Sequence, residues 1–229
     1  MPKKLQITKL SFVILARSHN PSLLNPDFLK VNNIIDQDWI TLSPTFSTEQ
    51  LSQVIFKNGI SLTLQPDRLT INQDFEDDFD NNDVLLADIA SKYLKTLPHI
   101  NYVALGINAT VFVPFDNEEK VDDYITNTLL RPGDWKDYHD STLEVSSNFI
   151  YSFDDYKINI TLSKAIKIKD EKPDEETFGI LFSGNIHRTI VLDMASANRI
   201  MPLVERVDHW QDDVNKYLSI INNCLLRDT

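Results

Sequence analysis

The amino-acid sequence predicts an α+β fold in which mainly antiparallel sheets carry helices packed on one side. Alternating apolar and polar residues, which are typical of half-buried strands, recur in several segments of the chain. The turns between these segments are too short for crossover helices, so neighbouring strands are expected to run antiparallel. Apolar residues at helical spacing then mark three helices, which separate the strands into groups.

The first half of the chain is predicted to form a meander, a helix and two further strands. Asn58-Gly59 is the strongest short-range signal for a hairpin, and Pro66-Asp67 supplies a second turn. Asn82 or Asp83 can cap the following helix, and Pro98 ends it. The expected elements are, in order, a strand over 4–17, a three-stranded meander over 52–73, a helix over 83–97 and a strand over 101–114.

The second half is predicted to form a helix, three strands and a final helix. Arg131-Pro132-Gly133 ends a helix, and Asp154-Asp155 forms a tight turn between two strands. Pro202 marks either a kink in the last helix or its true start. The expected elements are a helix over about 118–130, strands over 142–153, 156–169 and 177–191, and a helix over about 195–226.

These elements are expected to form a single domain over residues 1–229, a length that one hydrophobic core can support. The order of a meander followed by a helix occurs twice. It suggests two similar halves over 1–115 and 116–229, although no residue-level repeat supports them.

Composition limits the function classes. The formal net charge is −12, so the surface repels phosphate backbones and nucleic acid is not an expected partner. Cys224 is the only cysteine, which fits a reducing compartment. The apolar run from Phe12 to Ala16 is too short for a signal peptide, and no stretch approaches the roughly 20 apolar residues of a membrane helix. We therefore expect a cytoplasmic protein without membrane contact.

The acidic run over 74–83 is the densest group of hard oxygen ligands in the sequence. Asp78, Asp80 and Asn82 have the one-three-five spacing of a calcium loop. The sixth position is Asp83 instead of glycine, and the twelfth is Ile89, where a bidentate carboxylate is needed. We interpret the run as an acidic loop before a helix and predict no metal there.

The remaining chemical candidates are interpreted as structural. Asp154-Asp155 has nuclease-type residues, but it is interpreted as a hairpin turn. Ser183 lacks the glycine that a nucleophile elbow needs two positions before it, so it is expected in a turn or bulge of the last strand. Cys224 is expected to be a small buried hydrophobe. With five scattered histidines and only five glycines, the sequence predicts no catalytic residue, no metal site and no cofactor.

The C-terminal helix is the best candidate for an interaction surface. Its apolar residues, Trp210, Tyr217 and Ile221 among them, can exceed what one face of a sheet covers. An apolar excess of this kind is typical of a dimer seam, so these three residues are predicted as an interface of a homodimer. The alternative is that the helix packs on its own sheet.

Part of the first half also resembles a group of uncharacterised bacterial proteins. The resemblance is carried by Asn20-Pro21 through Phe28-Leu29, Asn58-Gly59-Ile60, Pro66-Asp67-Arg68-Leu69, Ile89 through Tyr102, and Gly106-Ile107-Asn108. It implies a bacterial cytoplasmic protein and brings no known activity or catalytic residue. By analogy of fold alone, the order of elements is similar to that of SecB-type chaperones, which pack antiparallel sheets with helices and bind clients through apolar grooves.

These observations favour a non-catalytic, acidic, protein-binding module that self-associates. Two other classes stay open. One is a metal-dependent hydrolase whose site assembles from distant residues, with acids of the 74–83 region and His99 or Asp154. The other is an immunity or antitoxin protein whose acidic surface covers a basic partner.

Overall fold

A computed structural model describes residues 4–75, 79–136, 143–169, 172–190 and 200–226. Its centre is one nine-stranded sheet in which every neighbouring pair of strands is antiparallel, with the order β2-β3-β4-β5-β1-β6-β9-β8-β7. The strands are β1 (Gln6–Ala16), β2 (Phe46–Ser47), β3 (Ser52–Ile55), β4 (Ile60–Gln65), β5 (Arg68–Asp74), β6 (Tyr102–Pro114), β7 (Ser146–Ser152), β8 (Tyr156–Lys169) and β9 (Lys172–Thr189).

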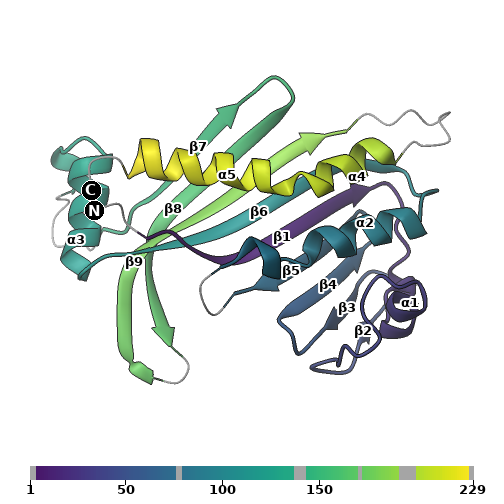
Figure 1. Ribbon diagram of the computed structural model, residues 1–229. Coiled ribbons are helices and arrows are strands. Elements are labelled where there is room, and N and C mark those ends of the chain that lie inside the picture. The colour runs from purple at the N-terminus through teal and green to yellow at the C-terminus, as the bar shows by residue number, and fades with distance from the viewer. Residues whose placement is uncertain (1–3, 76–78, 137–142, 170–171, 191–199, 227–229) are drawn as a thin grey trace.

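Helices cover one face of this sheet (Figure 1). Helix α2 packs on β1 and β5, and helix α5 packs on β6 and β9. The α-helices are α1 (Pro26–Val31), α2 (Leu86–Thr96), α3 (Glu118–Asp123), α4 (Met201–Asp208) and α5 (Trp210–Ile220). The predicted α+β class is confirmed.

The order of elements repeats within the sheet. A first unit runs β1, α1, a meander ending in β5, and α2; a second runs β6, α3, the meander β7-β8-β9, and then α4 and α5. The two units meet at the central pair of β1 and β6, with the two meanders on opposite flanks. In this order of elements the second unit begins with β6 at Tyr102, and the strand that pairs the two units is the first of each set.

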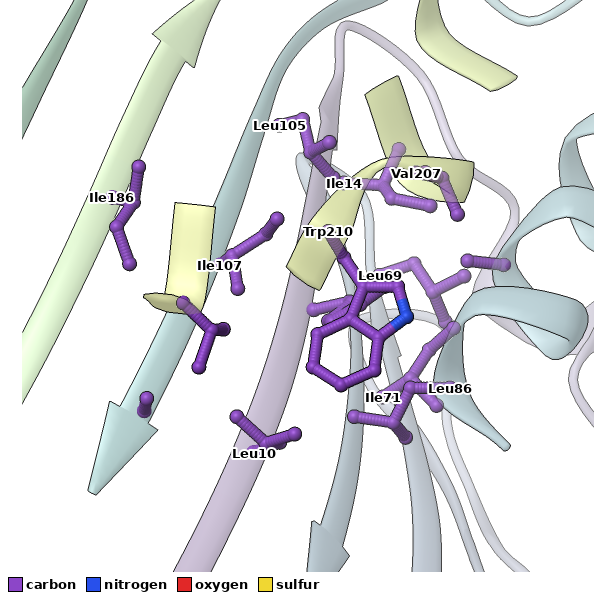
Figure 2. Close-up of a cluster of buried hydrophobic side chains, with 14 of the residues drawn as sticks. Leu10, Ile14, Leu69, Ile71, Leu86, Leu105, Ile107, Ile186, Val207 and Trp210 are labelled. Carbon is purple, nitrogen blue, oxygen red and sulfur yellow. The ribbon is translucent and has the colours of Figure 1, made fainter. Parts of the chain in front are cut away.

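The hydrophobic core lies between the sheet and its helices, as Figure 2 shows. Trp210 of α5 lies over the central strands, with its ring 6.2 Å from that of Phe12. The other core side chains labelled in Figure 2 come from strands of both units and from α2 and α4: Leu10, Ile14, Leu69, Ile71, Leu86, Leu105, Ile107, Ile186 and Val207.

Two predicted helices are interrupted. The helix expected over 118–130 is a six-residue α-helix followed by a π-helical turn over Tyr124–Leu129. The helix expected over 195–226 is divided at His209 into α4 and α5, and its residues before 200 lie outside the described part. Pro202 stands at the start of α4, where its missing N–H costs no hydrogen bond. No helix of the described residues is long and apolar enough to cross a membrane.

Candidate functional site

The face of the sheet opposite α2, α4 and α5 is defined here as the open face. Because side chains alternate across a strand, every second residue of each central strand points onto it. The pairing registers align one such residue from each of eight strands into a single row. From β3 to β7 this row is Ile55, Ser61, Asn72, Ser11, Asn108, Asn185, Asn159 and Ile150.

The six inner members of the row carry only amide or hydroxyl groups, and we call them the polar row. Asn185 donates to the Asn108 amide oxygen, and Asn72 donates to the Ser61 hydroxyl over 3.3 Å. The side-chain oxygen of Asn159 is buried and has no hydrogen-bond partner within the described residues. The row thus holds uncharged donors and acceptors, some of them satisfied by neighbours, and Asn185 in its middle is exposed.

The charge on the open face differs from that of the whole chain. Four basic residues point onto it from the described strands, and the acidic residue among them is Asp74, which pairs with Lys9 over 3.3 Å. The four are Lys9, Arg68, Lys157 and Lys167. Among the residues that the structure describes, the open face is therefore neutral to slightly basic, although the whole chain has a net charge of −12.

Apolar side chains flank the polar row. Val13 and Leu15 of β1 and Leu181 of β9 are half-buried, and Ile150 of β7 is 63% exposed. A face that mixes uncharged hydrogen-bonding groups with partly exposed aliphatic groups has the composition of a protein-contact surface, where charged residues are depleted at the centre.

The helix-covered side contains a second cluster, centred on Arg188 of β9. The Arg188 guanidinium is within 2.6 Å of a carboxylate oxygen of Asp213 in α5 and within 2.6 Å of Asp155 in the β7–β8 turn. Its central carbon lies 4.0 Å from the ring centre of Tyr156, and Phe153 stacks on that ring at 4.4 Å. The cluster ties the last helix and the turn to the sheet.

A cavity of about 490 Å³ opens beside this cluster. Its cationic groups already have partners: Arg188 binds Asp213 and Asp155, and Arg206 lies 3.6 Å from Asp155. We assign no ligand to it, because these charges balance within the chain. The lining residues are Asp155, Arg188, Thr189, Ile190, Pro202, Glu205, Arg206 and His209.

The residues predicted as an interface lie in the core. Trp210 is 2% exposed, and Tyr217 and Ile221 are fully buried. The Tyr217 ring lies against Gly184 of β9, and its hydroxyl donates to the Phe182 carbonyl over 2.9 Å. These side chains are covered by the chain's own sheet, so their surface is not accessible to a second chain.

The acids and the histidine of the hypothetical metal site are separated. The described acids of the 74–83 run precede α2, whereas His99 follows it. An eleven-residue helix spans about 16 Å, too far for one metal centre. Asp80 instead caps a short turn by accepting from the Asn82 amide, and Asp78 lies outside the described residues. Within the described ranges no three His, Cys, Asp or Glu side chains gather as metal ligands.

Two other candidates differ from their prediction. Cys224 was expected to be buried, but it is exposed, because the π-helical turn at Ile221–Leu225 rotates it out of the core. Ser183 lies in the regular part of β9, paired with Thr110 and Thr161, and not in a turn or bulge.

No family model matches the chain, and no curated protein is significantly similar to it. The function must therefore be argued from the surfaces described above.

Proposed function

We propose that this protein is a non-catalytic, acidic protein-binding module whose contact surface is the open face. The observation that carries the proposal is the polar row. It runs across six strands of an otherwise acidic protein without a charged member. Uncharged amides and hydroxyls cost less to desolvate than ions, and they hydrogen-bond readily to a partner's backbone or polar side chains.

The partner's contact patch should be neutral to acidic, since the described side chains place more basic than acidic groups on the open face, Lys157 and Lys167 among them. The single cysteine of the chain supports a cytoplasmic location. The resemblance described above supports a bacterial source.

A photo-crosslinking amino acid at Asn185 tests the proposal directly. Asn185 is exposed at the middle of the polar row, and Asn215 is an equally suitable exposed control on α5. We expect a discrete crosslinked protein from position 185 that position 215 does not give. The Asn185→Arg variant, crosslinked from Asn108, should lose it. Equal crosslinking from both positions, or none from Asn185, would contradict the proposal.

Thermal denaturation with Mg²⁺, Mn²⁺ or Ca²⁺ separates this function from the metal-dependent hydrolase. A binding module should show no shift in Tm at tens of micromolar metal, because a ligand stabilises only a protein whose native state binds it. Stabilisation that disappears in the Asp78→Asn and Asp80→Asn variants would favour the hydrolase. An immunity or antitoxin role would instead appear as tight binding of a basic protein that crosslinks from α5 and not from the open face.

A further inference from the structure

The two edges of the sheet are protected to different degrees. The β3 edge is covered by the two-residue strand β2 and by the segment before it, where the Leu42 amide donates to Ile55 over 2.8 Å and the Lys57 amide donates to Ile40 over 3.0 Å. At the other edge, β7 pairs with β8 along all seven of its residues. Its outer side has no partner strand in the described part of the chain.

The sequence of β7, Ser-Ser-Asn-Phe-Ile-Tyr-Ser, contains none of the usual protections of a free edge. Natural sheets block such edges with lysine, proline, a bulge or a very short strand, because exposed backbone N–H and C=O groups recruit another strand. β7 is regular, uncharged and free of proline over its whole length. It also presents Ile150, which is 63% exposed, on the open-face side.

The helix side of the same edge is only partly covered. Phe149 and Tyr151 pack against the margin of the core and keep part of their surface accessible. Burial raises the pKa of the Tyr151 hydroxyl, and a smaller electrostatic contribution from Cys224 also raises it. The side chains of a strand added beside β7 would cover part of the surface that these two rings still expose.

We propose that β7 pairs antiparallel with β7 of a second copy of this chain, giving one continuous sheet across a two-fold axis. This inference goes beyond the proposed function, because it concerns the outer edge of the sheet and not the open face. A strand that pairs with its own copy places the same patch on both sides of the axis, as in most homodimers. Each copy carries a net charge of −12, so two copies can approach closely only at a neutral patch, and β7 is such a patch.

The proposed pairing would also extend the open face. Ile150 stands at the β7 end of the row that contains the polar row. In an antiparallel pair, residues that face each other lie on the same side of the sheet. The open faces of two copies would therefore join into one surface, with the two Ile150 side chains near its middle.

Light scattering behind a sizing column tests the pairing over a range of protein concentrations. We expect a dimer whose dissociation constant rises at least ten-fold in Ile150→Lys, because this change places two ammonium groups at the seam. Ile40→Lys is the matched control, since Ile40 is 61% exposed at the opposite edge and should leave dimerisation unchanged. A monomer at all concentrations, or a dimer indifferent to Ile150→Lys, would overturn the proposal.

A spin label gives a second readout that does not depend on a disruptive change. In Cys224→Ser, the Asn148→Cys variant carries one label on β7 itself. Strands pair at about 4.8 Å and seven residues span roughly 23 Å, so labels on two paired β7 strands should lie within about 20 Å of each other. Longer distances in a confirmed dimer would place the seam elsewhere and reject the pairing.

The two proposals fail independently. A monomer that still crosslinks to another protein from Asn185 would remove the β7 pairing and leave the binding function intact. A β7 dimer without any crosslink from Asn185 would remove the binding function of the open face and leave the β7 pairing intact.

Discussion

At the scale of single residues, the buried ion pair of Arg188 and Asp213 makes the clearest prediction. Asp213 is 3% exposed, so removing its carboxylate leaves the Arg188 guanidinium without its buried partner. Breaking such a pair costs about 3–5 kcal/mol, and Asp213→Ala should lower the free energy of unfolding by roughly 3 kcal/mol in urea titrations. Asp155→Ala is the control. Its side chain is 63% exposed, and the change should cost under about 1 kcal/mol. Similar losses in both variants would contradict this account.

His19 should make stability depend on pH. Burial lowers the pKa of His19 below 6.5 in the folded chain, while the unfolded chain keeps the ordinary value. Below about pH 6.5 the unfolded chain therefore binds more protons than the folded one, and folding stability decreases as pH falls towards the folded pKa. The stabilising contribution is fully present above pH 6.5.

Urea unfolding of wild type and His19→Gln at pH 7.5 and 5.5 measures this effect. The replacement removes the titrating group near Tyr93, whose hydroxyl lies 3.3 Å from the His19 ring nitrogen Nδ1. Wild type should lose more stability between the two pH values than the variant does. An equal loss in both proteins would show that His19 does not carry the dependence.

At the scale of elements, the contact between α5 and β9 depends on a glycine. A Cβ atom at Gly184 would stand 2.5 Å from the Tyr217 ring, which is fully buried and hydrogen-bonded to β9. Gly184→Ala should therefore displace the helix and cost about 1–3 kcal/mol, as overpacking of a core does. Gly106→Ala is the control on the open face, where a Cβ meets atoms no closer than 3.5 Å. Thermal denaturation should show a large decrease in Tm for the first variant alone.

The elements themselves could be predicted wherever local chemistry decides them. The Asn58-Gly59 hairpin is present, with φ of +80° at Gly59, and the strand over 156–169 has the predicted bounds. The break at His209 and the π-helical turns could not be predicted, because tertiary packing sets them and the amphipathic pattern continues through them. The exposure of Cys224 follows from one of these turns.

The candidate site could not be predicted because it exists only after the strands are aligned. Each member of the polar row is an ordinary polar residue at an alternating strand position. Its neighbours in the row come from strands far apart in the sequence, such as Ser11 beside Asn72 and Asn108. A shift of one residue in a single register would move that strand's member to the core side. The predicted interface on the C-terminal helix has the same explanation. The sequence shows the apolar residues of this helix, but the sheet face that buries them exists only after the strands are aligned.

At the scale of the whole molecule, the two units should unfold together. They are joined by the pairing of β1 with β6, which runs from Gln6 beside Phe112 to Ala16 beside Tyr102. The core is also shared, because Trp210 of the second unit packs on Phe12 of the first. A hydrogen bond of 2.8 Å from Ser91 in α2 to Asp208 in α4 links their helices. Separating the units would expose the centre of the core, so neither should persist without the other.

Fluorine NMR of protein labelled with 5-fluorotryptophan can follow both units at once. Trp39 reports on the first unit, where its ring lies 5.1 Å from that of Phe56, and Trp210 reports on the shared core. Both native signals should disappear with the same urea midpoint and slope, as in a two-state transition. The exposed Trp135 serves as a reference for solvent effects on the shift. If the Trp39 signal were lost at lower urea while Trp210 stayed native, the first meander would be a separate folding unit and the shared core would not couple the halves.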